Sequence, residues 1–549
     1  MTTPSPYRIL FLRTGGRYAD LDPPDCPMIS PPRSLLFLAG VFKDDPSVET
    51  CLVDAFAHPD WDRIAREKAN PPFHFGMSDA DLLERIAKFQ PQMVAVTSTA
   101  NYFLEETIRV MDLVKERFPN VFLVVGGPDA TNDYREYFER TTAFDALALR
   151  EGEDTLRELA DRLRQGADWH DVAGLAWRRD TEVVRNPERP YIEDLDRLHP
   201  DYSVVDLERY FELGRKGFPS RLLPSYPGSH RSIDLVTSRG CHHPCAFCCI
   251  HLHMGSAFRT HSPEHVLAEM RELVEVHGVR NFHFEDDNLL HDMPRFMAIL
   301  DGIEKAGWDI TWDTPNGVRA DLITPAFLQK ARRTGCAYLI FGAESGSPEV
   351  LENVVKKNLT VEDLERACRL AWEHEIDTLA FFIFGMPGET RSQMDETYRF
   401  ALKMLRLYNA TPIFQIWRPY RNTPLELAIR GKDRVKPANT LDISRRHGIP
   451  YTLFYSQVYE DDEVTLPFLS ECFERYLHDI AWPLFKNWLR VARRDLRILL
   501  PTLAGMGWIV LKSLWRPSRI RALLQSYLSG PGLMPFAQLH RLGRRKPKA

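Results

Sequence analysis

The run TSRGCHHPCAFCCIH, residues 237–251, determines what this 549-residue chain can be. Cys241, Cys245 and Cys248 follow the spacing C-x3-C-x2-C directly after an expected strand at residues 232–237. Three thiolates on one short loop can hold an iron–sulfur cluster from one side. One iron then stays open, since a cubane cluster takes four ligands. Nine cysteines in the whole chain are too few for a disulfide framework, so the loop predicts a metal site.

Zinc is the competing metal for this loop. A structural zinc site takes four ligands, and His242, His243 or Cys249 can supply the fourth. With zinc bound, the loop would be structural and the protein a non-catalytic scaffold. Iron and sulfide analysis separates the two readings.

Strand and helix patterns alternate on both sides of the cysteine loop. Expected strands of the C-terminal side are residues 232–237, 281–284, 308–312, 337–341, 378–384 and 411–417. Expected helices between them are 263–277, 293–306, 325–333, 361–374 and 391–407. Six βα units are fewer than the eight of a closed barrel. We therefore expect an open, partial (β/α)6 barrel of the TIM type over residues 231–435.

The first 165 residues predict a separate α/β domain. Short apolar strands are expected at residues 7–12, 48–56, 93–98, 121–125 and 144–149, with helices such as 78–89, N-capped by Ser78, and 105–118. This alternation favours a doubly wound, Rossmann-like sheet, which binds ligands beyond the carboxyl ends of its strands. Residues 166–230, rich in Pro, Arg and Asp, are expected to form a linker with short strands.

The cysteine loop resembles the cluster-binding loop of the radical S-adenosylmethionine (SAM) superfamily. Gly240 precedes its first cysteine and Phe247 its third. The resemblance implies a [4Fe–4S] cluster on Cys241, Cys245 and Cys248, with SAM chelated at the open iron. One electron, from a flavodoxin- or ferredoxin-like donor, then cleaves SAM to methionine and a 5′-deoxyadenosyl radical.

Four later segments also resemble motifs of this superfamily: FEDD (284–287), NGVR (316–319), GAESG (342–346) and GMPGET (385–390). All follow expected strands, at the end where barrel chemistry takes place. Each of the four segments can also be explained as an ordinary surface turn or loop that binds nothing. By resemblance the expected SAM-binding residues are Phe247, Glu285, Asp286, Arg319, Glu344, Ser345 and Met386. Arg319 in addition suits bidentate pairing with a carboxylate.

Loops of the N-terminal domain resemble the cobalamin-binding domain found upstream of one large radical SAM class. The implied contacts are Thr97, Ser98, Gly126, Gly127, Pro128, Glu151 and Gly152. Many such domains carry Asp-x-His-x-x-Gly after the first strand, whose His ligates cobalt, whereas residues 13–17 read RTGGR. This departure fits relatives that leave the lower face of cobalt without a protein ligand. It also fits a degenerate domain without cobalamin.

The function implied by the resemblance is cobalamin-dependent radical SAM methylation. One SAM methylates the corrin and a second yields the radical. This radical takes a hydrogen from an unactivated carbon of a small-molecule or lipid substrate, which then collects the methyl group from methylcobalamin. The alternatives are a non-methylating radical reaction, such as ring formation, and a non-catalytic corrinoid- or metal-binding scaffold.

Charge is unevenly distributed along the chain. Residues 481–549 carry fourteen Lys or Arg and one Asp, a net +13 in a chain of net −6. We expect residues 436–549 to form a basic, mainly helical domain that is buried or contacts an anionic membrane peripherally. Nucleic acid is disfavoured, because the acidic remainder repels phosphates. The start of the chain has no signal-peptide core, so a cytoplasmic location is expected.

Overall fold

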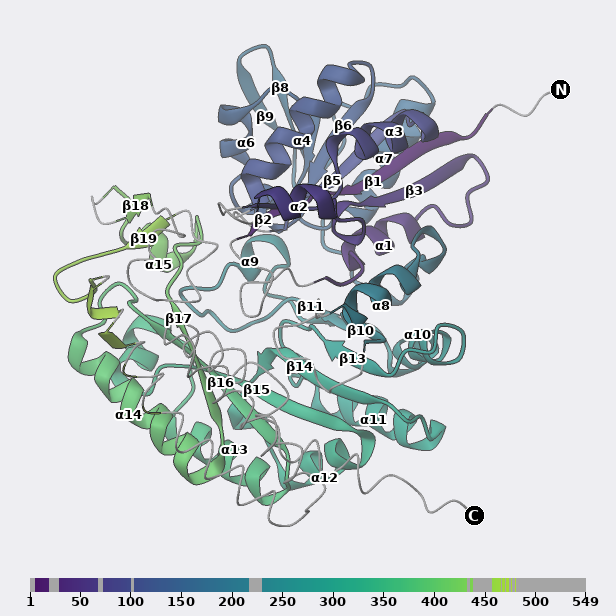
Figure 1. Cartoon of the computed structure of the whole chain (residues 1–549). Coiled ribbons are helices and arrows are strands. Elements are labelled where there is room, and N and C mark those ends of the chain that lie inside the picture. The colour runs from purple at the N-terminus through teal and green to yellow at the C-terminus, as the bar shows by residue number, and fades with distance from the viewer. Residues whose placement is uncertain are drawn as a thin grey trace.

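The computed structural model describes residues 5–18, 29–67, 73–99, 103–216, 230–431, 435–437 and 457–465, together with a few positions between 467 and 479. Two α/β domains lie one above the other, with α9 (Ile250–His253) and β11 (Ser238–Arg239) between them (Figure 1). The arrangement confirms the expected fold class, a doubly wound sheet followed by a partial barrel.

A seven-stranded sheet forms the centre of the N-terminal domain, in the order β3-β1-β5-β6-β7-β8-β9. Its first five strands are parallel, and β8 and β9 extend it antiparallel. The strands are β1 (Tyr7–Arg13), β3 (Val48–Asp54), β5 (Met93–Thr97), β6 (Phe122–Gly126), β7 (Ala146–Ala148), β8 (Leu175–Arg179) and β9 (Glu182–Arg185). Strand order reverses between β1 and β5, the point at which doubly wound sheets bind ligands.

Helices cover both faces of this sheet because its strands are apolar on both sides. Side chains of α1 (Arg33–Gly40) and α7 (Glu153–Arg164) pack on one face, and those of α3 (Asp79–Phe89) and α4 (Leu104–Arg117) on the other. The predicted cap is confirmed: Ser78 accepts the N–H of Asp81 at the start of α3. The shorter helices are α2 (Trp61–Glu67), α5 (Pro128–Asn132) and α6 (Tyr134–Arg140).

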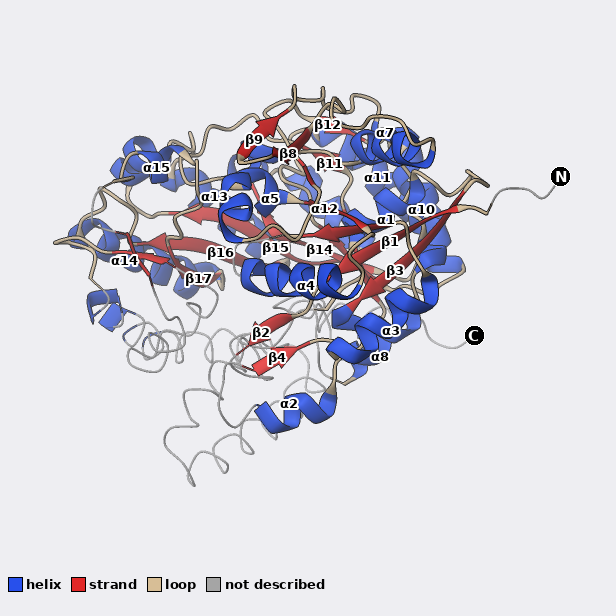
Figure 2. Ribbon diagram, turned by 90° about the horizontal axis from the view of Figure 1, so that it is seen from above, coloured by secondary structure: helices blue, strands red, loops and turns tan. Residues whose placement is uncertain are grey.

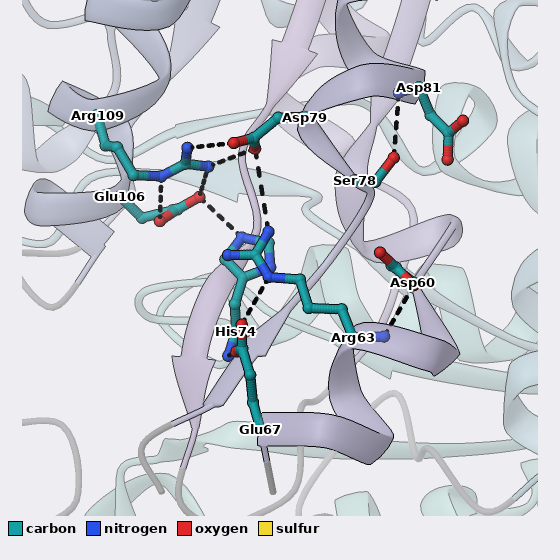
Figure 3. A network of polar contacts seen from close by, with 9 residues as sticks. All are labelled: Asp60, Arg63, Glu67, His74, Ser78, Asp79, Asp81, Glu106 and Arg109. Carbon is teal, nitrogen blue, oxygen red and sulfur yellow. Dashed lines mark hydrogen bonds and ion pairs between the residues drawn. The ribbon is translucent and has the colours of Figure 1, made fainter. Parts of the chain in front are cut away.

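A polar network fastens a small two-stranded sheet, β2 (Gly16–Tyr18) and β4 (Phe73–Phe75), to the helices α3 and α4 (Figure 3). His74 Nε2 lies 2.8 Å from Glu106 Oε1, and Arg109 bridges Glu106 and Asp79. Burial opposes ionisation of Glu106, but the hydrogen bonds from His74 and Arg109 prevail and lower its pKa to about 2. Glu106 is therefore ionised in the folded protein, and its bonds to His74 and Arg109 hold the β2–β4 sheet against α3 and α4.

The stretch predicted to be a linker does contain short strands, but β8 and β9 belong to the N-terminal sheet. Beyond them come the 3₁₀ turn η3 (Leu195–Arg197) and α8 (Leu207–Arg215). The limits proposed for the domains, 1–165, 166–230, 231–435 and 436–549, stay predictions.

The barrel domain is a six-stranded parallel sheet in sequential order, β10-β13-β14-β15-β16-β17. The strands are β10 (Ser232–Leu235), β13 (Asn281–Phe284), β14 (Thr311–Val318), β15 (Cys336–Glu344), β16 (Asp377–Phe384) and β17 (Thr411–Ile416). Five helices lie outside this sheet (Figures 1 and 2). They are α10 (Pro263–Glu275), α11 (Met293–Ala306), α12 (Pro325–Thr334), α13 (Val361–Glu373) and α14 (Arg391–Tyr408). The remaining elements are β12 (Arg259–Thr260), α15 (Pro424–Leu427), β18 (Val435–Pro437) and β19 (Gln457–Tyr459).

Two barrel strands extend three or more residues beyond their expected ends. The third was placed at residues 308–312 but spans Thr311–Val318, and the fourth, expected at 337–341, extends to Glu344. Register shifts in β14 around Thr314 let the strand continue past Pro315, a residue that cannot donate a ladder hydrogen bond. The NGV and GAE segments thus lie within strand ends, not after them.

The predicted C-terminal helical domain lies almost entirely outside the described residues, as does its basic segment. Within the described part of the chain, no helix has both the length and the hydropathy needed to cross a bilayer.

Candidate active site

The cysteine loop leaves the barrel through a tight turn that only glycine permits. Gly240 has φ +85°, and a Cβ there would lie 2.3 Å from the carbonyl oxygen of Ala257. The adjoining strands β11 and β12 pair antiparallel on the two sides of this loop. The sequence TSRG thus closes a small hairpin that carries Cys241 at its base.

All three predicted ligands are partly buried free thiols. Burial raises the pKa of Cys241 and of Cys248, and raises that of Cys245 to about 11. Such thiols become thiolates when a bound cation offsets the burial, as cluster iron would.

Two acidic side chains at the end of β13 hold the entrance of the cysteine loop. Asp286 Oδ1 accepts hydrogen bonds from Thr237 N, Thr237 Oγ1 and Ser238 Oγ, and Asp287 accepts from Gly240 N at 3.0 Å. Burial raises the pKa of Asp287 to about 7. The structure thus gives Asp286 a loop-holding role, and its contact with SAM stays a prediction.

The predicted carboxylate-binding arginine pairs within its own segment. Arg319 donates to both oxygens of Asp321 and to the carbonyls of Lys357 and Asn358. Glu344, expected near the ribose or methionine of SAM, accepts from Lys357 Nζ at 2.6 Å. Both charged groups lie near enough to Cys245 to affect its pKa, which Glu344 raises and Arg319 lowers, and their contact with SAM stays a prediction.

The other expected SAM contacts lie around the same strand ends. Ser345 is fully buried and shares a 2.8 Å hydrogen bond with Thr397, while Met386 is buried in the barrel core. Phe247 packs against that core and Glu285 is half-buried at the end of β13. These SAM contacts also stay predictions.

Glu389 gives the GMPGET segment a measurable pH dependence. Its Oε2 accepts the N–H groups of Gly385 and Met386, yet burial prevails and raises its pKa from 4.5 to about 8. From pH 4.5 to 8 the folded chain keeps a proton that the unfolded chain has lost. The contribution of this proton to the free energy of unfolding is full below pH 4.5 and is lost as the pH rises through 8.

We expect Glu389→Gln to abolish this fall in the free energy of unfolding with pH, which is at most about 1.4 kcal/mol per pH unit. Urea unfolding midpoints between pH 5 and 9 measure it, with Glu396→Gln, exposed on α14, as the control. An unchanged slope in Glu389→Gln would contradict the assignment.

A cavity that is partly open to solvent lies between the two domains. Six of the seven predicted cobalamin contacts line it: Thr97, Gly126, Gly127, Pro128, Glu151 and Gly152. The barrel contributes Val236, Arg239, His253 and Met254, which flank the cysteine loop in the sequence.

Ser98, the seventh predicted contact, is completely buried behind this wall. It supports the GGP turn through its carbonyl oxygen, which accepts Asp129 N at 3.2 Å, and through its hydroxyl, which bonds to Tyr137 at 2.6 Å. Gly127 has φ +107°, and a Cβ there would lie 2.4 Å from that same carbonyl. The turn therefore keeps a side-chain-free rim at the sheet edge, suited to a flat corrin ring.

A buried ion-pair cluster joins the two sides of the cavity. Arg239 donates to Glu151 at 2.8 Å and to Glu153 at 2.6 Å, and Arg259 donates to Glu151 at 2.8 Å. Arg239 comes two residues before Cys241, whereas both glutamates follow β7. The expected cofactor contact Glu151 thus also fixes the cysteine loop relative to the N-terminal sheet.

Several residues of this site were missed at the sequence level. Arg239 stands in the TSRG run and His253 lies shortly after the cysteine loop, but neither belongs to a motif that indicates a function. No sequence motif marks Lys357, or Arg33 and Phe37, which line the cavity from α1.

Comparison with known proteins matches two separate parts of the chain to family models. Residues 235–401 match the Radical SAM superfamily and residues 27–160 match the B12 binding domain. The first range contains the cysteine loop and four of the six barrel strands, β13 to β16. The second contains the predicted corrin loops.

The relatives include two kinds of enzyme. An uncharacterized methyltransferase of Pyrococcus horikoshii is 28% identical over 396 residues, covering 72% of this chain and 77% of the relative. The anaerobic magnesium-protoporphyrin IX monomethyl ester cyclase of Rubrivivax gelatinosus is 28% identical over 400 residues, covering 72% and 65%. The solved radical SAM methyltransferase TsrM from Kitasatospora setae shares the fold, with a TM-score of 0.62 at 19% identity, over 87% of this chain and 88% of that chain.

Proposed function

We propose that the chain is a cobalamin-dependent radical SAM enzyme and that it methylates an unactivated carbon of a small-molecule substrate. Its cofactors are a [4Fe–4S] cluster, SAM and cobalamin, as expected from the cysteine and GGP loops. The observation that carries the proposal is the cavity lined by the predicted corrin loops on one side and by the flanks of the cysteine loop on the other.

When bound, the cluster supplies the electron that cleaves SAM and the corrin carries the methyl group. The protein's own part is positioning. Asp286 and Asp287 hold the loop from β13, and Arg239 ties it to the N-terminal domain. The cavity lining is mainly apolar, which limits the water that can quench a radical.

Transfer of isotope from SAM tests the proposal. Holoenzyme, SAM with a deuterated methyl group, reductant and a metabolite extract are combined without oxygen. We expect a small molecule that gains the labelled methyl group, together with 5′-deoxyadenosine. Omission of the reductant is the control and should remove both products.

Ring formation is the second candidate, favoured by the likeness to the cyclase. It predicts extract-dependent 5′-deoxyadenosine with a product that carries no label from the methyl group. That outcome would replace methylation as the function.

Two partners are proposed from the chemistry and the sequence. A flavodoxin- or ferredoxin-like protein delivers the electron, because the cluster must be reduced before it can cleave SAM. The basic segment 481–549 contacts an anionic membrane from the cytoplasm, which would bring a lipid substrate within reach.

A further inference from the structure

Three metal-ligating side chains converge outside the active site, where the linker meets the barrel. Asp196 lies in η3, His261 directly follows β12, and His265 is in the first turn of α10. Asp196 Oδ1 is 3.5 Å from His261 Nδ1 and 3.7 Å from His265 Nδ1. Ligand atoms of all three residues lie within 4.8 Å of one another.

The backbone around the three side chains is held firmly. Ser262 N donates to Asp196 Oδ1 at 2.8 Å, and Ser262 Oγ caps α10 by accepting from His265 N. The N–H of His261 donates to the carbonyl of Thr237 at 3.0 Å. The backbone that carries the three ligands is therefore fixed, so an ion could bind by rearranging side chains without reordering the chain.

One nitrogen of the cluster is buried without a hydrogen bond. His261 is only 3% exposed, and its Nδ1 has no hydrogen-bond partner among the residues the structure describes. This nitrogen is the atom that faces Asp196. Buried polar atoms normally find a partner, so an orphaned one in a set of ligands points to a missing cation.

We propose that Asp196, His261 and His265 bind one divalent transition-metal ion, with zinc as the first choice. Two imidazoles and a carboxylate are a donor set that zinc accepts, at about 2.0–2.2 Å. The two rings stack with their centroids 4.3 Å apart, so they must turn toward the ion to bind it. Asp196 is partly exposed, so water can complete the coordination.

The ion would join the linker to the barrel. Asp196 lies on the linker, whereas both histidines lie on the barrel just beyond β12, the partner strand of β11. The ion would thus be a structural cross-link near the cysteine loop, held by residues other than the cluster ligands and the residues that line the cavity.

The test uses holoenzyme whose cysteines already carry the iron–sulfur cluster. Zinc is added, unbound metal is removed by gel filtration, and metals are measured per chain. We expect one zinc in the wild type and a dissociation constant at least about 100-fold weaker in Asp196→Asn and His265→Gln. His170→Ala is the matched control, since His170 pairs with Asp168 in the same linker without a third ligand.

Iron content reports separately on the active site and should be equal in all four proteins. Hydrogen exchange near η3 should slow when zinc binds to the wild type and stay unchanged in the two variants. Wild-type protein that retains no zinc would overturn the proposal. So would variants that bind zinc as tightly as the wild type.

Discussion

Replacing Cys245 with alanine is expected to leave the protein without a [4Fe–4S] cluster and unable to cleave SAM. The thiol lies on the loop between β11 and α9, and each of the three cysteines would ligate a different iron. Two ligands cannot hold a cubane with an exchangeable fourth corner. We expect iron and sulfide to fall to trace levels and 5′-deoxyadenosine to fall to the level of a sample without enzyme.

Cys249 provides the matched control, because it is a neighbouring thiol outside the C-x3-C-x2-C spacing. It is the residue just before α9, and burial raises its pKa to about 11. Cys249→Ala should keep its iron and its SAM cleavage. If Cys249→Ala lost the cluster and Cys245→Ala kept it, the ligand assignment would be wrong.

Replacing Arg239 with glutamine is expected to destabilise the protein by about 3–5 kcal/mol, the cost of breaking a buried ion pair from one side. Arg239 and Glu153 are both more than nine-tenths buried. Glu151 would keep its ion pair with Arg259, but Glu153 would lose the guanidinium that donates to it. The same change loosens the cysteine loop from the corrin loop, so cobalamin affinity should fall as well.

Urea unfolding and cobalamin titration measure both effects. Arg197→Gln is the control: Arg197 pairs with Asp154 of the same helix α7, but both side chains are exposed. An exposed pair contributes roughly 0–1 kcal/mol, so this variant should resemble the wild type. Equal, small losses in the two variants would show that the buried cluster does not hold the domains together.

The sequence predicted the elements of the fold better than the contacts between them. Strand and helix positions follow local periodicity, and Ser78 caps α3 because its residue type suits that position. The third barrel strand was expected at residues 308–312 but spans Thr311–Val318, because register shifts in β14 carry it past Pro315.

The candidate site was predicted only where a local motif exists. The cysteine spacing and the GGP turn are continuous in sequence, and the structure places both at the domain junction. Arg319 looked available for a ligand, but its partner Asp321 depends on how the chain turns after β14. The pairing of Arg239 with Glu151 joins residues far apart in the chain, and no spacing rule reaches that far.

Metal and corrin analysis of wild-type protein tests the central claim most directly. Protein purified without oxygen and reconstituted with iron, sulfide and hydroxocobalamin is measured for iron, sulfide, cobalt and zinc, alongside its visible spectrum. The account predicts one cubane of four irons and one cobalt per chain, with cluster and corrin absorption in the same sample. A colourless protein with zinc on its cysteines, without iron or cobalt, would contradict it.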